Sequence, residues 1–247
     1  MEQFSRTALL LGDADMDALA NARIIVFGTG GVGSWCIEAL ARCGVGAITI
    51  VDSDTVSVSN INRQLVADFT SVGAIKTTVM AQRIINVNPA CQVQASACVY
   101  NEGTAHLFSL DSYDVVVDAI DSVGPKALLI ERATRCRHAR LVSSMGAALK
   151  TDIFAITEAE FNNVTGDPLA RALRDRFKRL GTRPARKFRC VYSPQIVRNK
   201  QDAGTDNTAN GRKRVNGTIV TTTAAFGLAL AQLAIQTAIK RKKLQNI

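Results

Sequence analysis

Cysteine pairs with a metal-binding or redox spacing are missing from this sequence. Its six cysteines are scattered, and no two of them stand in a C-x-x-C arrangement. A zinc ribbon or a thioredoxin-type motif is therefore not expected. We interpret the cysteines as small buried hydrophobic residues, because they fall in apparent helices and strands. The two histidines, His106 and His138, lack a partner motif and are given no role.

An internal repeat is also missing, and so is a basic leader followed by a short apolar stretch and a cleavage site. We therefore expect a cytoplasmic protein with one main domain and excursions from it. Apolar residues make up 47% of the 247 residues and charged residues 21%, which excludes an intrinsically disordered chain. A chain of this length can bury one sizeable core.

Acidic residues are scarce in one segment. Residues 171–214 hold 14 Lys/Arg and 3 Asp/Glu, a balance of +11, whereas the rest of the chain has a balance of −2. A near-neutral body with one basic segment predicts a local contact with a polyanion. The alternative is a solvated helix face. The candidate nucleic-acid-binding residues are Arg171, Arg174, Lys178, Arg179, Arg212, Lys213 and Arg214.

What the sequence does contain is a regular alternation of short apolar runs and helical patterns. Strands are expected at 23–28, 47–52, 113–121, 139–144 and 188–193, and helices at 32–44, 74–88, 124–137, 166–181 and 217–239. This alternation predicts an α/β protein with a Rossmann-like, mainly parallel sheet and helices on both faces. We expect residues 1–150 to form the nucleotide-binding part and residues 151–247 to form an α+β extension on the same core.

The extension has three recognisable segments. Asp167 as N-cap, Pro168 in the first turn and Gly181 past the end frame the helix at 166–181. Residues 199–217 are polar and predict a mobile loop. Residues 217–239 carry no charge, which raises the alternative of a membrane span. Three consecutive threonines and two glutamines favour a buried helix instead, so no stable membrane insertion is expected.

"GTGGVG" fits a dinucleotide-binding fingerprint, because it lies after a strand and before a helix, and Asp52 follows about 20 residues further on. The glycines allow backbone N–H groups to approach phosphate, and the carboxylate takes ribose hydroxyls. The fingerprint positions are Gly28, Gly30 and Gly33. It indicates a nucleotide and leaves NAD, FAD and ATP open.

Two cations near this fingerprint favour ATP. When a carboxylate attacks the α-phosphate, charge builds on that phosphorus and on departing pyrophosphate, so preorganised cations and Mg²⁺ lower the barrier. Arg63 and Lys76 supply such charges, and Asp118 or Asp121 is a candidate for the metal. The alternative is that Arg63 and Lys76 are solvated surface residues, an explanation that suffices for either residue considered by itself.

"GTGGVGSW", "DSDTVSVSNINRQ", "VGAIK" and "DAIDS" resemble the nucleotide site of the ubiquitin-activating-like adenylyltransferases, which include the ThiF and MoeB proteins. Within that superfamily, "FSRTALLLG", "DAIDSVGPKALLI", "SSMGAALKTD" and "DPLARALRDRFKRLG" are similar to the tRNA threonylcarbamoyladenosine dehydratase family. The resemblance is collinear over most of the chain and weakens after about residue 181.

The resemblance implies a role for each matching position. It places Gly28, Gly30, Gly31 and Gly33 at phosphate, Asp52 at ribose, Asp121 at the metal, and around the nucleotide Asp54, Asn60, Arg63, Gln64, Lys76 and Asp118. Arg6 matches an arginine that related enzymes send into the partner subunit's site, which implies a homodimer. The catalytic residues that the resemblance implies are Arg63, Lys76, Asp121 and Arg6. Each of these roles has a structural alternative. Asn60 and Gln64 are also explained as residues that brace their loop, Asp118 as a helix cap, and Arg6 as part of a surface ion pair.

The sequence departs from related families in two respects. The zinc-binding cysteine pairs of sulfur-carrier activators are missing, which argues against a ubiquitin-like protein substrate. Cys190 stands where many dehydratases of this family have a cysteine. We interpret it as a thiol packed in a strand, with a covalent or sulfur-handling role as the alternative. A cysteine that some relatives have near the last helix is missing here, so a sulfur-transfer partner carries less support.

We therefore expect an ATP-dependent enzyme that adenylates the carboxylate of threonylcarbamoyladenosine in tRNA and closes a ring with loss of water, using ATP and Mg²⁺. Adenylation of a sulfur-carrier or ubiquitin-like protein is the second hypothesis, and a NAD-dependent oxidoreductase or nucleotide-sensing module is the third.

Overall fold

The computed structural model describes residues 2–201, 205–208 and 211–245, and of 205–208, 211–214 and 244–245 it describes only the backbone. Seven strands form one sheet in the order β3-β2-β1-β4-β5-β7-β6. Its strands are β1 (Arg23–Phe27), β2 (Ala47–Val51), β3 (Gln92–Ser96), β4 (Val115–Asp118), β5 (Arg140–Ser144), β6 (Thr157–Glu160) and β7 (Arg189–Tyr192).

All neighbouring pairs in the sheet are parallel except β6 with β7. The chain runs outward from β1 through β2 to β3, returns to β4 beside β1, and then continues outward through β5. This reversal creates a switch point between β1 and β4, where doubly wound sheets bind ligands beyond the carboxyl ends of the strands. The expectation of a Rossmann-like, mainly parallel α/β sheet is confirmed.

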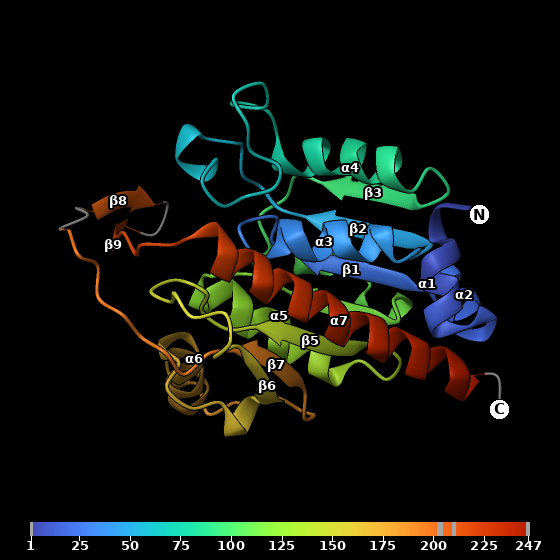
Figure 1. The fold of residues 1–247 in the computed structure, drawn as a ribbon. Coiled ribbons are helices and arrows are strands. Elements are labelled where there is room, and N and C mark those ends of the chain that lie inside the picture. The colour runs from blue at the N-terminus through green and yellow to red at the C-terminus, as the bar shows by residue number, and fades with distance from the viewer. Residues whose placement is uncertain (1, 202–204, 209–210, 246–247) are drawn as a thin grey trace.

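Helices cover both faces of the sheet (Figure 1). The helices are α1 (Ser5–Leu11), α2 (Asp13–Ala20), α3 (Gly33–Arg42), α4 (Lys76–Val87), α5 (Val123–Arg135), α6 (Pro168–Arg179) and α7 (Val220–Gln245). Apolar residues of α2, α3, α4 and α7 belong to the core on one face, and residues of α5 and α6 belong to the core on the other. Because both faces are covered, the central strands are continuous apolar runs.

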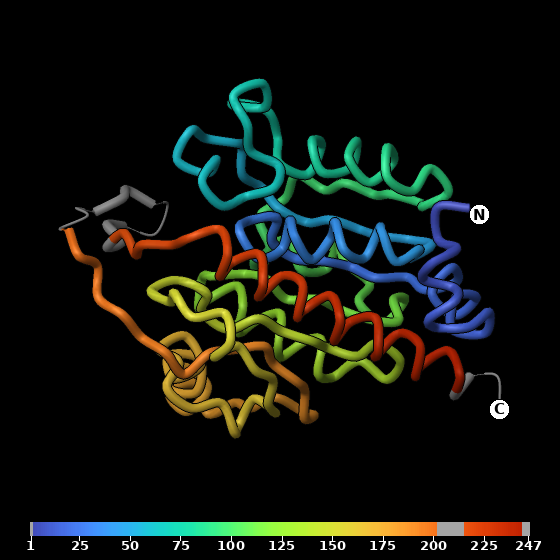
Figure 2. The backbone as a smooth tube through the Cα atoms, in the orientation of Figure 1, coloured from blue at the N-terminus to red at the C-terminus, as the bar shows by residue number. Residues whose placement is uncertain are grey.

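The last helix packs along α3 over the first face of the sheet, and Figure 2 traces the two lying side by side. Gly227 makes the close approach: a Cβ there would lie 2.5 Å from the backbone oxygen of Val32. Residues 220–243 are long and apolar enough to cross a membrane, yet 56% of the most apolar window is buried inside the protein. Phe226, Leu230 and Ala234 are among its core residues.

Two strands of the seven-stranded sheet were not expected from the sequence. β3 and β6 lie at the two edges of the sheet, and their side chains are mostly exposed or half-buried.

The prediction of a loop over 199–217 is wrong in part, because β8 (Thr205–Thr208) and β9 (Gly211–Arg214) form an antiparallel hairpin there. Their sequences lack the apolar alternation that reveals a half-buried strand. Asn199 closes the base of this excursion: its Nδ2 donates to the Val215 oxygen at 2.9 Å, and its Oδ1 accepts from Gly217 N at 2.9 Å.

The helix expected at 166–181 is observed as α6 with its expected ends. Asp167 Oδ1 accepts a hydrogen bond from Ala170 N at 2.9 Å, Pro168 is the first helical residue, and Gly181 follows the helix with φ of 64°. Leu173 and Phe177 are buried on its inner face.

Candidate nucleotide and acyl-activation site

A cavity of about 780 Å³ opens beyond the carboxyl ends of β1, β2, β4 and β5. It brings together residues from the glycine turn, the segment after β2, the start of α4 and the segment after β4. The predicted site residues that line it are Gly28, Gly30, Gly31, Asp52, Asp54, Asn60, Arg63, Gln64, Lys76 and Asp121. Gly33 and Asp118 lie behind its wall, and Arg6 lies elsewhere.

The turn after β1 requires glycine for two different reasons. Gly28 has φ of 94°, and a Cβ on Gly33 would lie 1.9 Å from the Gly28 oxygen, so both positions are fixed by the backbone itself. Gly30 differs, because a Cβ there would meet no atom within 4 Å. Its missing side chain therefore leaves open space at the N-terminal end of α3, where phosphate is stabilised by backbone N–H groups.

Asp52 is held at the end of β2 by two backbone donors. Its Oδ2 accepts from Thr29 N at 2.6 Å and its Oδ1 accepts from Asp54 N at 2.8 Å. Burial raises the pKa of this carboxyl, although the two N–H groups and the charge of Lys76 act in the opposite direction. The carboxylate is thereby fixed between the glycine turn and the cation beside it, as a ribose-binding group requires.

Lys76, the first residue of α4, points back toward the end of β2. Its Nζ lies 2.8 Å from Asp54 Oδ2, and the Lys76 side chain is 5% exposed, whereas that of Asp54 is 66% exposed. A buried ammonium whose ion-pair partner faces solvent retains attraction for an anion in the cavity.

The segment carrying Arg63 is anchored on α3. Ser34 Oγ donates to the Gly30 oxygen at 2.7 Å and accepts from Leu65 N at 3.1 Å, while Trp35 Nε1 donates to the Arg63 oxygen at 3.1 Å. The guanidinium of Arg63 is held by Nη1, which donates to the Ser59 oxygen at 2.9 Å. The "GSW" that follows the glycine turn therefore sets the position of Arg63 relative to that turn.

Asn60 and Gln64 are both buried in this segment. Asn60 Oδ1 accepts from Ser57 N at 3.2 Å, which braces the loop. Gln64 differs, because its buried Oε1 has no hydrogen-bond partner within the described residues. A buried amide oxygen without a donor is costly, and a ligand group or water in the cavity would satisfy it.

The two aspartates of "DAID" have different places. Asp118 ends β4 inside the core: its Oδ2 lies 2.8 Å from Lys126 Nζ and accepts from Ser143 Oγ at 2.7 Å, and both charged side chains are 0% exposed. Lys126 Nζ also donates to the Ile120 oxygen at 2.9 Å, so the pair shapes the turn that carries Asp121.

Asp121 is exposed and lines the cavity. A single carboxylate completed by phosphate oxygens and water is an arrangement that Mg²⁺ accepts. No cluster of three or more His, Cys, Asp or Glu residues suited to a metal occurs in the described part of the chain. The donor set therefore fits a metal that arrives with a phosphate ligand.

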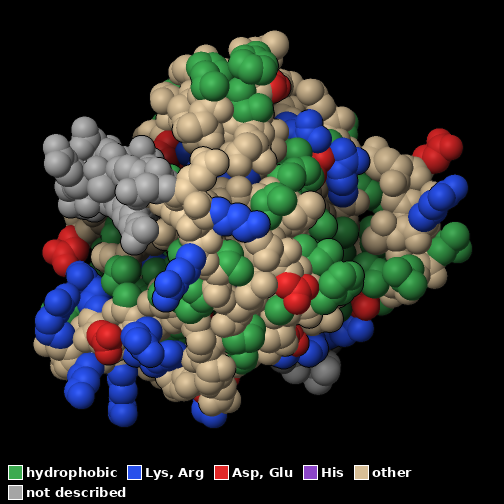
Figure 3. All heavy atoms as spheres, turned by 60° about the vertical axis from the view of Figure 1, so that its left-hand side comes forward, with side chains coloured by type: hydrophobic (Ala, Val, Ile, Leu, Met, Phe, Trp, Pro, Cys, Tyr) green, Lys and Arg blue, Asp and Glu red, His purple; other side chains and the backbone are tan. Residues whose placement is uncertain are grey.

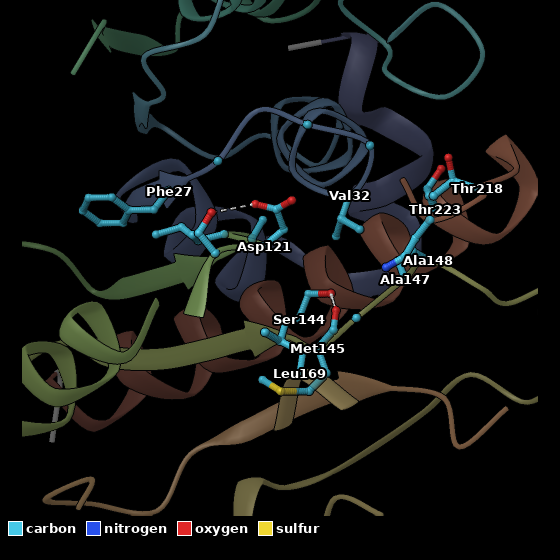
Figure 4. Close-up of a pocket in the computed structure, with 18 of the residues that line it drawn as sticks. Phe27, Val32, Asp121, Ser144, Met145, Ala147, Ala148, Leu169, Thr218 and Thr223 are labelled. Atoms are coloured by element: carbon cyan, nitrogen blue, oxygen red, sulfur yellow. Dashed lines mark hydrogen bonds between the residues drawn. The ribbon is translucent and has the colours of Figure 1, made fainter. Parts of the chain in front are cut away.

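The far side of the cavity was missed by sequence reasoning. Figure 4 shows Asp121 facing a wall of small and apolar residues from the segment after β5, with Thr218 and Thr223 to one side. The wall includes Met145, Gly146, Ala147, Ala148, Leu149, Lys150, Asp167 and Leu169. The sequence signals here were the family motifs "SSMGAALKTD" and "DPLARALRDRFKRLG" and the helix cap at Asp167, and none of them indicated site residues.

Lys150 and Asp167 are the two charged groups of this wall. Lys150 Nζ donates to the oxygens of Ser193 and Gln195 at 2.8 and 2.6 Å and lies 3.8 Å from Asp167 Oδ2. Burial lowers the pKa of Lys150, and Asp167 opposes that effect. Asp167 Oδ2 also accepts from Gly146 N at 3.2 Å, so the pair ties α6 to the segment after β5.

The other predicted residues lie outside the cavity. Arg6 is exposed on α1, at the end of the sheet opposite to the β8–β9 hairpin (Figure 1). Arg171, Lys178 and Arg179 are exposed on α6, and Arg174 is half-buried over the Phe161 ring. Figure 3 shows Lys and Arg side chains gathered at the lower left of the face it draws. The side chains of Arg212, Lys213 and Arg214, in β9, lie outside the described residues.

Cys190 lies on β7 with a fully buried side chain, packed in the core with Phe161 and Phe188. Burial raises the pKa of its thiol well above the ordinary range. The position does not line the cavity, and a neutral packed thiol is the state that this environment favours.

The fold and this cavity define a nucleotide-binding α/β protein in which two cations supplement the glycine turn. The ThiF family model matches residues 4–247, and the chain belongs to the ThiF family. It is 39% identical to tRNA threonylcarbamoyladenosine dehydratase of Escherichia coli strain K12, over 95% of this chain and 92% of that protein. Identity to the protein of the same name from Bacillus subtilis strain 168 is 37%, over 83% and 82% of the two chains.

Solved structures agree with these relatives. The crystal structure of the E. coli dehydratase in complex with AMP matches with a TM-score of 0.87 and 35% identity, covering 98% of this chain and 96% of that one. The complex of the same enzyme with ATP gives a TM-score of 0.85 at 34% identity, covering 99% and 96%. The resemblance to this family that the motifs indicate is therefore confirmed.

Proposed function

We propose that this protein is an ATP-dependent dehydratase that acts on threonylcarbamoyladenosine in tRNA. The observation that carries the proposal is the presence of Arg63 and Lys76 in one cavity with the glycine turn, in a chain that aligns nearly end to end with dehydratases solved with ATP and AMP. Hydride transfer gives no reason to add cations to a diphosphate already held by the turn, whereas adenylation requires them.

The first step is attack of the substrate carboxylate on the α-phosphorus of ATP. A carboxylate oxygen forms the new O–P bond, and the bond to the β-phosphate oxygen breaks with release of pyrophosphate. Arg63 and Lys76 would offset the charge that builds on the phosphates, and Asp52 would hold the ribose. Asp121 would hold Mg²⁺, which would supply further neutralisation of the phosphate charge.

The second step is ring closure within the substrate. A nitrogen of the carbamoyl group attacks the activated acyl carbon, the C–O bond to AMP breaks, and the nitrogen loses its proton. The carboxylate oxygen leaves with AMP, so the product is lighter than the substrate by the elements of water. Because both reacting groups belong to one molecule, proximity supplies the nucleophile, and the enzyme needs no covalent residue of its own.

The wider assignments follow the same proposal. Residues 1–150 would carry the nucleotide chemistry, and basic residues of the 151–247 extension would hold the tRNA backbone. Arg6, exposed on α1 and remote from its own cavity, would enter the site of a second copy in a homodimer. We also propose a cytoplasmic location without membrane insertion, since α7 packs in the core.

The test is mass spectrometry of nucleosides from tRNA incubated with the protein, ATP and Mg²⁺. We expect threonylcarbamoyladenosine to be replaced by a nucleoside lighter by one water, with one AMP formed per product. Unchanged nucleosides would overturn the proposal. Pyrophosphate exchange that depends on a small carrier protein ending in Gly-Gly would assign the same site to protein adenylation instead. A rise in melting temperature with NADH and not with ATP would indicate an oxidoreductase or a nucleotide sensor.

A further inference from the structure

Three arginines from separate elements meet at the turn between α5 and β5. Arg140 of β5 donates from Nη1 to the oxygens of Arg137, His138 and Ala139 at 3.0, 2.8 and 3.2 Å. Arg186, before β7, donates from Nε and Nη2 to the Thr134 oxygen at 3.2 and 3.3 Å. Arg241 of α7 lies with Nη2 2.8 Å from His138 Nδ1. We call Arg140, Arg186 and Arg241 the arginine cluster.

No carboxylate in the described part of the chain forms an ion pair with the arginine cluster. Asp111 lies nearby, but its oxygens accept from the backbone N–H groups of Arg137, His138 and Ala139 at 3.3, 2.6 and 3.1 Å. Burial lowers the pKa of Arg140, and the charges of Arg241 and Arg186 lower it further. The three guanidinium groups therefore repel one another, and the charge of Asp111 offsets only part of this effect at Arg140.

Capping of α5 explains only part of this arrangement. Arg186 binds the last carbonyls of that helix, as a cation at a helix C-terminus commonly does. Arg241 Nε, however, is buried and has no hydrogen-bond partner among the residues that the structure describes. Arg140 uses Nη1 alone in its hydrogen bonds within the described residues. All three arginines are half-buried and so remain accessible from solvent.

Fixed guanidinium groups with spare N–H donors and a shared excess of charge are suited to phosphate oxygens. The arginine cluster lies at the amino ends of β4 and β5, opposite to the edge where the cavity opens. Arg186 follows the end of α6 by seven residues, and exposed Arg183 lies between them. The cluster therefore extends a basic surface away from the cavity and cannot serve the nucleotide bound there.

We propose that the arginine cluster binds a phosphodiester group of tRNA outside the anticodon loop, while the modified adenosine occupies the cavity. The proposal rests on the proposed function for the identity of the RNA, and the site itself is new. A long polyanion reaches both ends of the sheet, whereas a short hairpin placed in the cavity reaches only one. This difference in length makes the two contacts separable.

The test compares full-length tRNA with its isolated anticodon stem-loop, both carrying the modified adenosine. The variant is Arg186→Gln with Arg241→Gln, and the control is Arg171→Gln with Lys178→Gln on exposed positions of α6. We expect the cluster variant to weaken binding of full-length tRNA and to reduce the slope of log K against log salt by about one, because one phosphate contact is lost. Stem-loop binding and turnover should stay at the wild-type level. The α6 control should weaken both RNAs.

Three outcomes overturn the site. The first is unchanged affinity of the cluster variant for full-length tRNA, and the second is an equal loss of affinity for both RNAs. The third is binding of free inorganic phosphate at the arginine cluster at concentrations that do not release tRNA. Thermal melting separates a folding defect from a binding defect, and Arg186→Lys with Arg241→Lys should restore part of the salt dependence if charge is what matters. Failure of the proposed function is distinguishable, because wild-type protein would then leave both RNAs unmodified.

Discussion

Lys76 and Asp54 form an ion pair, with 2.8 Å between Nζ and Oδ2, in which the cation is buried and the anion faces solvent. The pair crosses from the start of α4 to the segment after β2 and so fixes the ammonium at the wall of the cavity. Exposed pairs contribute little to stability, because water competes for both charges. This pair is therefore better understood as a device that orients Lys76 toward the nucleotide.

Replacing Lys76 should remove chemistry with limited loss of binding. In Lys76→Met, we expect the rate of AMP formation from ATP, measured with tRNA as substrate, to fall by about a hundredfold or more. This is the typical effect of losing one donor that stabilises charge in the transition state. Asp54→Asn is the matched control, since it removes the partner and leaves the ammonium. It should lower the rate by less than about tenfold. Equal losses in both variants would show that the pair, and not the cation, matters.

The glycine turn offers a second matched pair. Gly30→Ala should fold normally, since the new Cβ meets no atom within 4 Å, and it should weaken ATP binding by crowding the phosphate. Gly33→Ala should instead destabilise the fold, because its Cβ would lie 1.9 Å from the Gly28 oxygen. Thermal melting with and without ATP separates the two effects. Full ATP binding by Gly30→Ala would contradict phosphate at this position.

Trp35→Phe tests whether α3 positions Arg63. The substitution keeps an aromatic ring and removes the N–H that donates to the Arg63 oxygen at 3.1 Å. We expect a loss of about 1 kcal/mol in the free energy of unfolding, as for one hydrogen bond, and a several-fold increase in KM for ATP. Steady-state kinetics together with urea denaturation measure the two quantities. An unchanged KM with reduced stability would limit Trp35 to packing.

Substitutions of Asp118 and Asp121 should have different effects, the first on stability and the second on the magnesium requirement. Asp118→Asn leaves Lys126 without its anion in the core, and breaking a buried pair costs about 3–5 kcal/mol, so the melting temperature should fall. Asp121→Asn should leave stability nearly unchanged and raise the Mg²⁺ concentration needed for activity. Calorimetry and a magnesium titration measure these effects. A stable Asp118→Asn variant with impaired ATP binding would return Asp118 to the nucleotide site.

The raised pKa of Asp52 predicts an unusual dependence on pH. The folded protein holds this proton more tightly than the unfolded chain, so the contribution of Asp52 to stability is present at acid pH and is lost as pH rises through the folded pKa. Ribose binding needs the ionised form and should change in the opposite direction. Nucleotide affinity should therefore fall on acidification above the ordinary aspartate range, and Asp52→Asn should remove that step.

The parts of the fold that sequence predicts are those with strong local chemistry. β1 and β4 are continuous β-branched runs, and α6 has a capping residue, a proline and a terminal glycine. β3 and β6 escaped notice because exposed edge strands carry no apolar pattern. Among the site residues, the glycine turn, Asp52 and Lys76 follow from spacing and resemblance.

The rest of the site depends on tertiary contacts that spacing cannot reveal. Two aspartates three residues apart look alike in "DAIDS", and only the buried Lys126 shows which of them is internal. The sequence predicts Asp167 only as a helix cap, and the structure shows that it also accepts a hydrogen bond from Gly146 N in the segment after β5. Lys150 likewise has no local signature, because its partners lie more than 40 residues further along the chain.

The close approach of Gly227 to Val32 has a consequence for protein synthesis. The backbone next to the glycine turn is covered by α7, which comprises residues 220–245. On the ribosome, the glycine turn is translated well before the helix that covers it. A nascent chain that still lacks this helix would expose the apolar face that α7 covers, and nucleotide binding would be completed only after α7 has been added.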